Sequence, residues 1–340
     1  MTTISRRKTF QLVMGGSLGL MARTTAPAFA APQAIDERGF VTIGGIEQWI
    51  AIQGQSRSNP AILYLHGGPG EAQSPFLDQF KPWQSDFTVV NWDQRGAGKT
   101  FGRHGAATPD MTPERFVEDV CEVAAHVCAR LDQKKVILVG QSFGSLLGVQ
   151  AILRRPELFH AYVGTAQVVS IPATIIDLAR YARQKAADAG DRVTLNALDA
   201  AVALPEPARL GAMRKASSKW AASVSDLPYT KMIEDFRGHA PYPVGDVADW
   251  VDGVHFSTNT IGPTLITMDM RTLGLDMPVP FFIFQGRDDH VTGAEPARAY
   301  AADIRAPAKG YVALDGGHYA CFTDPDQFVG ALRTHVLPLV

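Results

Sequence analysis

The chain has 340 residues, of which 46% are hydrophobic and 19% are charged. This composition is typical of a globular protein and excludes collagen-like, low-complexity and disordered chains. The formal net charge of −2 gives no electrostatic reason to expect nucleic acid or an anionic membrane surface as a partner.

Residues 1–30 have the three parts of an export signal. Arg6 and Arg7 precede an apolar stretch at 10–22, and Ala-Phe-Ala at 28–30 matches the A-x-A pattern of a cleavage site. The paired arginines resemble a twin-arginine (Tat) signal. The apolar stretch of about 13 residues is shorter than the roughly 17 needed to span a bilayer. We therefore expect a periplasmic or secreted protein that keeps no membrane contact once the signal is cleaved.

Short apolar runs alternate with helical patterns from residue 40 to about 165. Residues 41–43 and 48–52 flank two glycines, which is typical of a hairpin. Three nearly continuous apolar runs are typical of strands buried on both faces, at 61–65, 87–92 and 136–140. The repetition of strand, helix and strand predicts a mostly parallel sheet with right-handed crossovers.

Two helices are predicted among these strands. Residues 113–131 keep apolar side chains at helical spacing, with Thr112 as the N-cap, and residues 143–154 form a second helix before a proline. Cys121 and Cys128 are about 10.5 Å apart along the first helix axis. A disulfide needs Cα atoms within roughly 7 Å, so we expect this pair to stay reduced.

The second half of the chain changes character. From about 168 to 275 it is Ala-rich and helical, and strand patterns return at 279–285 and 310–314, before a last helix around 325–336. A helical insertion of about 100 residues is too long for a loop. We predict a core formed by two segments with a helical cap between them, at residues 31–168, 169–277 (the cap) and 278–340.

The pentapeptide Gly-Gln-Ser-Phe-Gly at 140–144 places Ser142 between a predicted strand and a predicted helix. This is the setting of a nucleophile elbow, a turn so sharp that side chains at the glycine positions would clash. The turn would lift the Ser142 hydroxyl clear of the sheet, where the helix N-terminus favours negative charge. The alternative is a serine that only caps the helix.

A nucleophilic serine needs a base and an acid that holds the base. His318 lies in a glycine loop after a predicted strand, and Asp289 follows the strand before it. The order Ser142, Asp289, His318 is that of a catalytic triad on a strand–turn–helix elbow. Asp288 is a competitor for the acid, but the Gly-x-x-Asp spacing favours Asp289. We interpret His290 as structural.

The glycine-rich loop at 66–70 also follows a predicted strand. An N–H from it, that of Gly68, can pair with the Phe143 N–H to stabilise an oxyanion. We interpret His66 as a brace for the loop. The sequence has no His-Glu-x-x-His motif, no clustered Cys/His spacing and no Walker loop, so we expect neither a metal nor another cofactor.

Three motifs, His-Gly-Gly-Pro-Gly at 66–70, Asp-Gln-Arg-Gly-Ala-Gly at 93–98 and Gly-Gln-Ser-Phe-Gly-Ser at 140–145, resemble the α/β-hydrolase superfamily, and within it the prolyl aminopeptidase (proline iminopeptidase) group. The resemblance covers about residues 40–168 and 278–340. It implies the α/β-hydrolase fold, a mostly parallel sheet of about eight strands flanked by helices with a helical cap. It also implies a substrate that is the N-terminal residue of a short peptide or arylamide.

The sequence departs from that group at several positions. Glu71 stands where the group continues with glycine, and Phe143 where it often has tryptophan. The group's cap glutamates, which bind the substrate amino group, have no matching motif here, and Glu234 and Asp235 are our candidates for that role. Residues 164–169 resemble a broader set of bacterial hydrolases.

We therefore predict a serine hydrolase that acts through an acyl-enzyme on a small molecule or short peptide. A prolyl-aminopeptidase-like peptidase is the leading interpretation, and a carboxylic-ester or lactone hydrolase is the alternative. Epoxide hydrolases and haloalkane dehalogenases attack with aspartate, so a serine at 142 argues against them. A non-catalytic binding module is the remaining alternative, and a complete triad argues against it.

Overall fold

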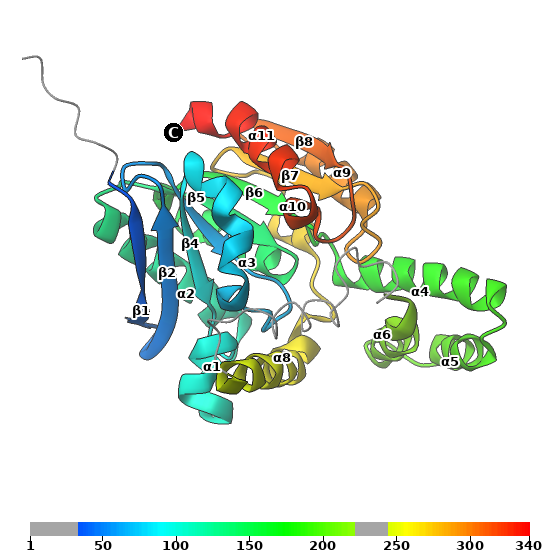
Figure 1. The fold of residues 1–340 in the computed structure, drawn as a ribbon. Coiled ribbons are helices and arrows are strands. Elements are labelled where there is room, and N and C mark those ends of the chain that lie inside the picture. Colours follow the sequence, from blue (N-terminus) through cyan, green and yellow to red (C-terminus); the bar gives the residue numbers. More distant parts are fainter. Residues whose placement is uncertain (1–32, 222–243) are drawn as a thin grey trace, which may run out of the picture. The chain divides into compact units, whose positions relative to one another are not determined.

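The computed structural model describes residues 33–221 and 244–340, so the predicted export signal lies outside the described residues. Eight strands form one sheet in the order β1-β2-β4-β3-β5-β6-β7-β8 (Figure 1). The six strands β4, β3, β5, β6, β7 and β8 are parallel to one another, whereas β2 is antiparallel to both β1 and β4. The predicted mostly parallel sheet is confirmed. The strands are β1 (Ile35–Ile43), β2 (Ile46–Gly54), β3 (Ala61–Leu65), β4 (Thr88–Asp93), β5 (Val136–Gln141), β6 (Phe159–Thr165), β7 (Phe281–Gly286) and β8 (Lys309–Leu314).

Helices cover both faces of the sheet because its central strands are apolar on both sides. In β3, Leu63 packs into a core with α2, α3 and α9, whereas Ile62 and Tyr64 point into a second core with η1 and α11. The predicted helix 113–131 is α2, and Thr112 caps it by accepting a hydrogen bond from the Arg115 N–H at 3.2 Å. The helices of these layers are η1 (Ser74–Ser85), α2 (Pro113–Leu131), α3 (Phe143–Arg154), α9 (Ala294–Asp303) and α11 (Pro325–His335).

Between β6 and β7 the described chain is helical, as expected for the segment 169–277. The helices α4, α5 and α6 pack on one another through side chains such as Ala179 and Leu198, and α8 lies beside α1 (Figure 1). Their bounds are α4 (Ile171–Asp188), α5 (Arg192–Val202), α6 (Ala208–Ala221), α8 (Val244–Leu265) and α1 (Gly98–His104). The division into core and cap at 168 and 277 stays a prediction.

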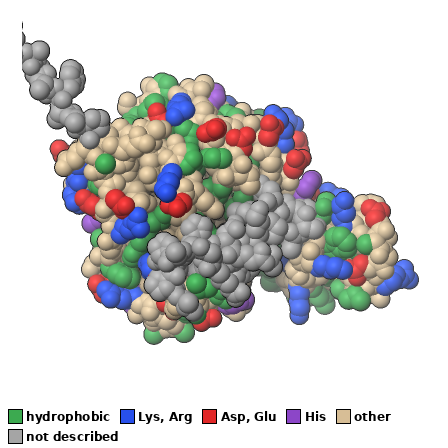
Figure 2. Space-filling model, in the orientation of Figure 1, with side chains coloured by type: hydrophobic (Ala, Val, Ile, Leu, Met, Phe, Trp, Pro, Cys, Tyr) green, Lys and Arg blue, Asp and Glu red, His purple; other side chains and the backbone are tan. Residues whose placement is uncertain are grey.

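The remaining elements are short, and none of the described helices is long and apolar enough to cross a membrane. On the face that Figure 2 shows, basic and acidic side chains are interspersed over the described surface, as the small net charge suggests.

The cysteines Cys121, Cys128 and Cys321 are buried and reduced, which agrees with the expectation for the first two. The short elements are η2 (Gly105–Ala107), η3 (Pro156–Leu158), η5 (Met270–Leu273), α10 (Ala320–Thr323) and η6 (Leu337–Leu339).

A buried ion pair holds the turn that follows β4. Arg95 Nε donates to Asp119 Oδ2 of α2 at 2.7 Å, and both side chains are 0% exposed. Arg95 also donates to the carbonyl oxygens of Pro109 at 2.7 Å and Gly44 at 3.2 Å. Gln48 Nε2 donates to Asp119 at 2.9 Å. The pair therefore ties this turn to α2 and to the β1–β2 hairpin.

Arg95→Met should lower the free energy of unfolding by about 3 kcal/mol, because it removes the buried cation of Asp119 and leaves the carboxylate only Arg115, at 2.9 Å, as an ion-pair partner. Denaturant unfolding followed by circular dichroism measures this loss. Arg38→Met is the matched control, since Arg38 pairs with Asp36 at 2.8 Å on the surface and such pairs contribute about 1 kcal/mol or less. Equal losses in the two variants would contradict the structural role of the buried pair.

Candidate active site

Ser142 lies in the turn that joins β5 to α3, with φ 51° and ψ −118°. A residue other than glycine rarely adopts a positive φ, so the backbone at Ser142 is strained. The Ser142 N–H donates to the Thr165 carbonyl oxygen at the end of β6 at 3.1 Å. The turn therefore has the geometry expected of a nucleophile elbow.

The two glycines of the pentapeptide are required by close backbone contacts. A Cβ at Gly140 would lie 2.7 Å from the Gly144 carbonyl oxygen. A Cβ at Gly144 would lie 2.2 Å from the carbonyl oxygen of Leu65, the last residue of β3. Both separations are far below van der Waals contact, so α3 can begin this close to β3 only where these side chains are absent.

Ser145 is a brace for the elbow that sequence analysis did not single out. Its hydroxyl donates to the Ser142 carbonyl oxygen at 2.6 Å and accepts from the Val168 N–H at 3.0 Å. The elbow is thus fixed at two points, through Thr165 at the end of β6 and through Val168 in the segment that follows. The signal in the sequence was a second serine within the first turn of a predicted helix.

The predicted base and acid meet at the carboxyl ends of the neighbouring strands β7 and β8. His318 Nδ1 lies 3.2 Å from each carboxylate oxygen of Asp289, and the two side chains are 7% and 0% exposed. Asp288, the competing acid, is exposed to solvent. His290 stacks on Tyr181, with ring centroids 5.1 Å apart. The carboxylate beside His318 is therefore that of Asp289.

Four further hydrogen bonds fix the Asp289 carboxylate. Gln285 Nε2 donates at 2.8 Å, the Thr292 hydroxyl at 2.6 Å, and the N–H groups of Val291 and Thr292 at 2.9 and 3.0 Å. Burial works to raise the pKa of Asp289, but the charge of His318 and the hydrogen bonds from His318 and Thr292 outweigh it and hold the pKa below its usual value. The carboxylate is therefore ionised and fixed in orientation.

Gln285 and Thr292 were missed by sequence analysis. Gln285 also accepts a hydrogen bond from the Gln167 N–H at 2.8 Å, so it links the loop after β6 to Asp289. The available signal was a glutamine at the carboxyl end of an otherwise apolar strand, since a buried amide must find partners.

The glycine-rich loop approaches the elbow closely. A Cβ at Gly67 would lie 3.0 Å from the Ser142 Cβ, and Gly68 has φ 107°. His66 braces this loop, because its Nε2 accepts a hydrogen bond from the Gln94 N–H at 3.2 Å. Burial lowers the pKa of His66 to about 4, so the ring is neutral and can accept that bond at neutral pH.

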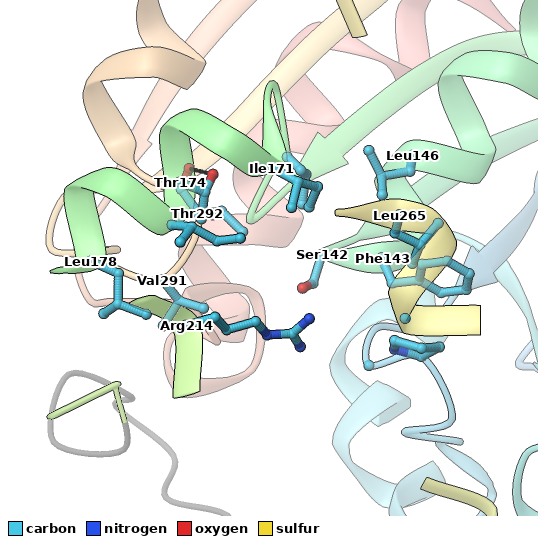
Figure 3. Close-up of a pocket in the computed structure, with 15 residues that line it drawn as sticks. Ser142, Phe143, Leu146, Ile171, Thr174, Leu178, Arg214, Leu265, Val291 and Thr292 are labelled. Carbon is cyan, nitrogen blue, oxygen red and sulfur yellow. Dashed lines mark hydrogen bonds between the residues drawn. The ribbon is translucent and has the colours of Figure 1, made fainter. Parts of the chain in front are cut away.

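One pocket brings three of the predicted residues together: Ser142, Gly68 and Phe143 (Figure 3). The Phe143 N–H belongs to the first turn of α3 and so has no partner within that helix. Thr292, which bonds Asp289, lines the same pocket, so the Asp289–His318 pair lies next to it. The other lining residues are mostly apolar: Pro69, Leu146, Val168, Ile171, Thr174, Ile175, Leu178, Arg214, Gly262, Leu265 and Val291.

Glu71 is a carboxylate close to the predicted base. It accepts a hydrogen bond from the hydroxyl of Tyr319, the residue after His318, at 3.1 Å. Burial raises the pKa of Glu71, against the lowering effects of the His318 charge and the Tyr319 hydrogen bond. Sequence analysis noted Glu71 only as a departure from a family pattern. The candidates Glu234 and Asp235 lie outside the described residues.

The arrangement contains the groups that an acyl transfer requires. A serine on a strained turn and the backbone N–H groups beside it line one pocket, and a histidine held by an ionised carboxylate lies next to that pocket. Within the described ranges, no group of three His, Cys, Asp or Glu side chains is placed to hold a metal ion.

The sequence profile of the alpha/beta hydrolase fold matches residues 60–325, a span that includes every residue of this site. The chain belongs to the alpha/beta hydrolase fold family. Among its relatives, the probable aminopeptidase YbaC of Bacillus subtilis is 26% identical over 315 residues, which cover 87% of this chain and 94% of that protein. A proline iminopeptidase of Saccharolobus solfataricus is 24% identical over 144 residues, 42% of this chain and 45% of that protein.

Solved structures share the fold of this chain. The crystal structure of a proline iminopeptidase-related protein from Thermus thermophilus superposes with a TM-score of 0.61 at 20% identity, covering 90% of this chain and 100% of that one. A proline iminopeptidase from Mycobacterium smegmatis gives a TM-score of 0.61 at 20% identity, covering 88% and 97%. Together with family membership, the hydrolase names of the relatives support a hydrolase that acts on a small molecule or a peptide.

Proposed function

We propose that this hydrolase works through a covalent acyl-enzyme formed on Ser142, with His318 as general base and Asp289 as its positioning partner. The observation that carries the proposal is the strained, glycine-flanked turn at Ser142, in a pocket next to the Asp289–His318 pair. Asp289 faces His318 Nδ1, so the proposal assigns the exchange of the serine proton to His318 Nε2.

The proposed reaction has two matched steps. The Ser142 oxygen bonds to the substrate carbonyl carbon while its proton passes to His318, and the N–H groups of Gly68 and Phe143 stabilise the oxyanion. Collapse breaks the bond to the leaving amine or alcohol, which takes the proton from His318. Water then attacks the carbonyl carbon of the acyl-enzyme in the same way and gives its proton to His318. Collapse breaks the bond to the Ser142 oxygen, which takes that proton back, and the carboxylic acid is released.

Ser142→Ala should lower kcat by a factor of about 10⁴ or more while the fold persists, because it removes the nucleophile. Turnover of para-nitrophenyl esters and prolyl arylamides, with circular dichroism for the fold, tests this. Ser218→Ala, at an exposed position on α6, is the control and should keep wild-type turnover. Near-normal activity in the Ser142 variant would refute the acyl-enzyme.

For the substrate, we propose an aminopeptidase-like reaction that releases N-terminal residues from short peptides. Support comes from the relative named as a probable aminopeptidase, which matches this chain over most of its length. Such an enzyme must neutralise an ammonium next to the reacting carbonyl, since burying that charge unpaired is costly. Of the described carboxylates, Glu71 has the suitable place, beside Tyr319 and His318. Glu234 and Asp235 remain candidates for the same task.

Glu71→Gln should lower kcat/KM for prolyl arylamides about thirtyfold or more, because losing one partner of a buried charge pair costs about 2 kcal/mol or more. The same change should leave N-acetylated substrates and esters nearly unaffected, since they carry no ammonium. Glu157→Gln, at an exposed glutamate in a surface pair with Arg155, is the matched control. Equal effects on blocked and free amines would remove Glu71 from this role.

Hydrolysis of an ester or lactone is the second candidate. The observation that favours it is the pocket lining, which among the described residues is apolar apart from Arg214 and a few hydroxyl groups and includes no carboxylate. Cleavage of simple aryl esters without cleavage of prolyl arylamides would decide for this alternative.

We also propose that residues 1–30 direct export through a twin-arginine pathway, on the strength of their sequence pattern alone. Replacing Arg6 and Arg7 together by lysine should keep the precursor in the cytoplasm, whereas Arg23→Lys should not. Cell fractionation and mass spectrometry of the mature N-terminus, expected near Ala31, measure this. An active protein that is found in the cytoplasm and still begins at Met1 would refute export.

A further inference from the structure

Arg214 carries the charge among the described residues that line the pocket at Ser142. The side chain extends from α6 into the pocket, with its guanidinium directed to the side where the Ser142 hydroxyl projects (Figure 3). The surrounding walls are formed by aliphatic side chains such as Ile175, Leu178 and Leu265. A cation in this setting is an unusual feature of an apolar pocket.

Arg214 reaches the pocket from beside the buried face of α6. It is four residues after Leu210 and three before Ser217, both of which are 0% exposed, whereas Arg214 itself is exposed to solvent. Residues three and four apart share a helix face, so Arg214 lies next to that buried face. Its side chain therefore lines the pocket and is also accessible from solvent.

Two other cations of α6 have acidic partners, whereas Lys215 forms no ion pair among the described residues. Arg209 pairs with Glu206, and Lys219 pairs with Asp191 at 2.7 Å. Among the residues that the structure describes, Arg214 forms no such ion pair. Within residues 33–221 and 244–340, no carboxylate therefore occupies the donors of this guanidinium.

We propose that Arg214 binds a carboxylate of the substrate, so that this enzyme selects substrates that carry an acid group at the end remote from the scissile bond. The planar guanidinium fork matches a carboxylate through two parallel hydrogen bonds, which an ammonium or an amide cannot reproduce. The apolar walls would hold the carbon chain between that acid and the reacting carbonyl. This inference rests on the proposed function, because it places the reaction at Ser142.

The carboxylate can belong to either part of the substrate, and two pairs of aryl esters separate these sources. For the acyl part, the mono-para-nitrophenyl ester of adipic acid is compared with para-nitrophenyl hexanoate. For the leaving group, para-acetoxybenzoate is compared with its methyl ester. Within each pair, only one compound carries the anion.

The wild-type enzyme should prefer the anionic member of one pair. Arg214→Gln should lower kcat/KM for that member about ten- to a hundredfold, the value of a charge-assisted hydrogen bond, and change the neutral member less than about twofold. Arg214→Lys should retain part of the preference, because it keeps the charge without the fork. Arg209→Gln, on the same helix with a surface partner, should leave both pairs unchanged.

Two results would overturn the inference: no preference for an anionic ester in the wild type, or an equal loss for anionic and neutral esters in Arg214→Gln. Ser142→Ala, measured with the neutral esters, separates these failures from a failure of the proposed function. If that variant is inactive while Arg214→Gln is unselective, the acyl-enzyme stands and Arg214 has no role in selection. If wild type cleaves prolyl arylamides but no ester of either pair, the inference about Arg214 fails and the acyl-enzyme stands; if it cleaves neither class of substrate, both proposals fail.

Discussion

The backbone at Ser142 adopts a conformation that a free chain would rarely populate. The strands next to Ser142 maintain this conformation, and the rest of the site depends on them. Three parallel strands supply them: β3 approaches α3 through Leu65, β5 leads into the turn, and β6 accepts its N–H at Thr165. A strained turn persists only when its surroundings over-determine it. The interior of the sheet provides that support, which a surface loop could not.

Different strands hold different parts of the site at the carboxyl ends of the sheet. The strands in the middle fix the serine and the glycine-rich loop, whereas β7 and β8 fix Asp289 and His318. The two halves are joined by Gln285, which bonds both Asp289 and the segment that also holds the elbow. Small shifts of one half relative to the other are therefore resisted by buried hydrogen bonds as well as by packing.

Sequence alone predicted the features that depend on local pattern. The parallel sheet, the helix capped by Thr112 and the turn at Ser142 follow from periodicity and glycine placement, and spacing was enough to prefer Asp289 over Asp288. It did not single out the strand Phe159–Thr165, whose apolar run is broken by a histidine and a glycine.

Nor could sequence assign roles to residues whose partners are distant in the chain. The Glu71–Tyr319 contact spans 248 positions, and the place of Arg214 in a pocket is visible only once α4, α6 and α8 are seen to form that pocket with the elbow.

The burial of the reduced thiols has a practical consequence for handling the protein. Burial raises the pKa of Cys121 to about 11, so this thiol is protonated at pH 7. Alkylating reagents and oxidised glutathione react with thiolates, so purification in air without a reductant should leave this side chain chemically unchanged.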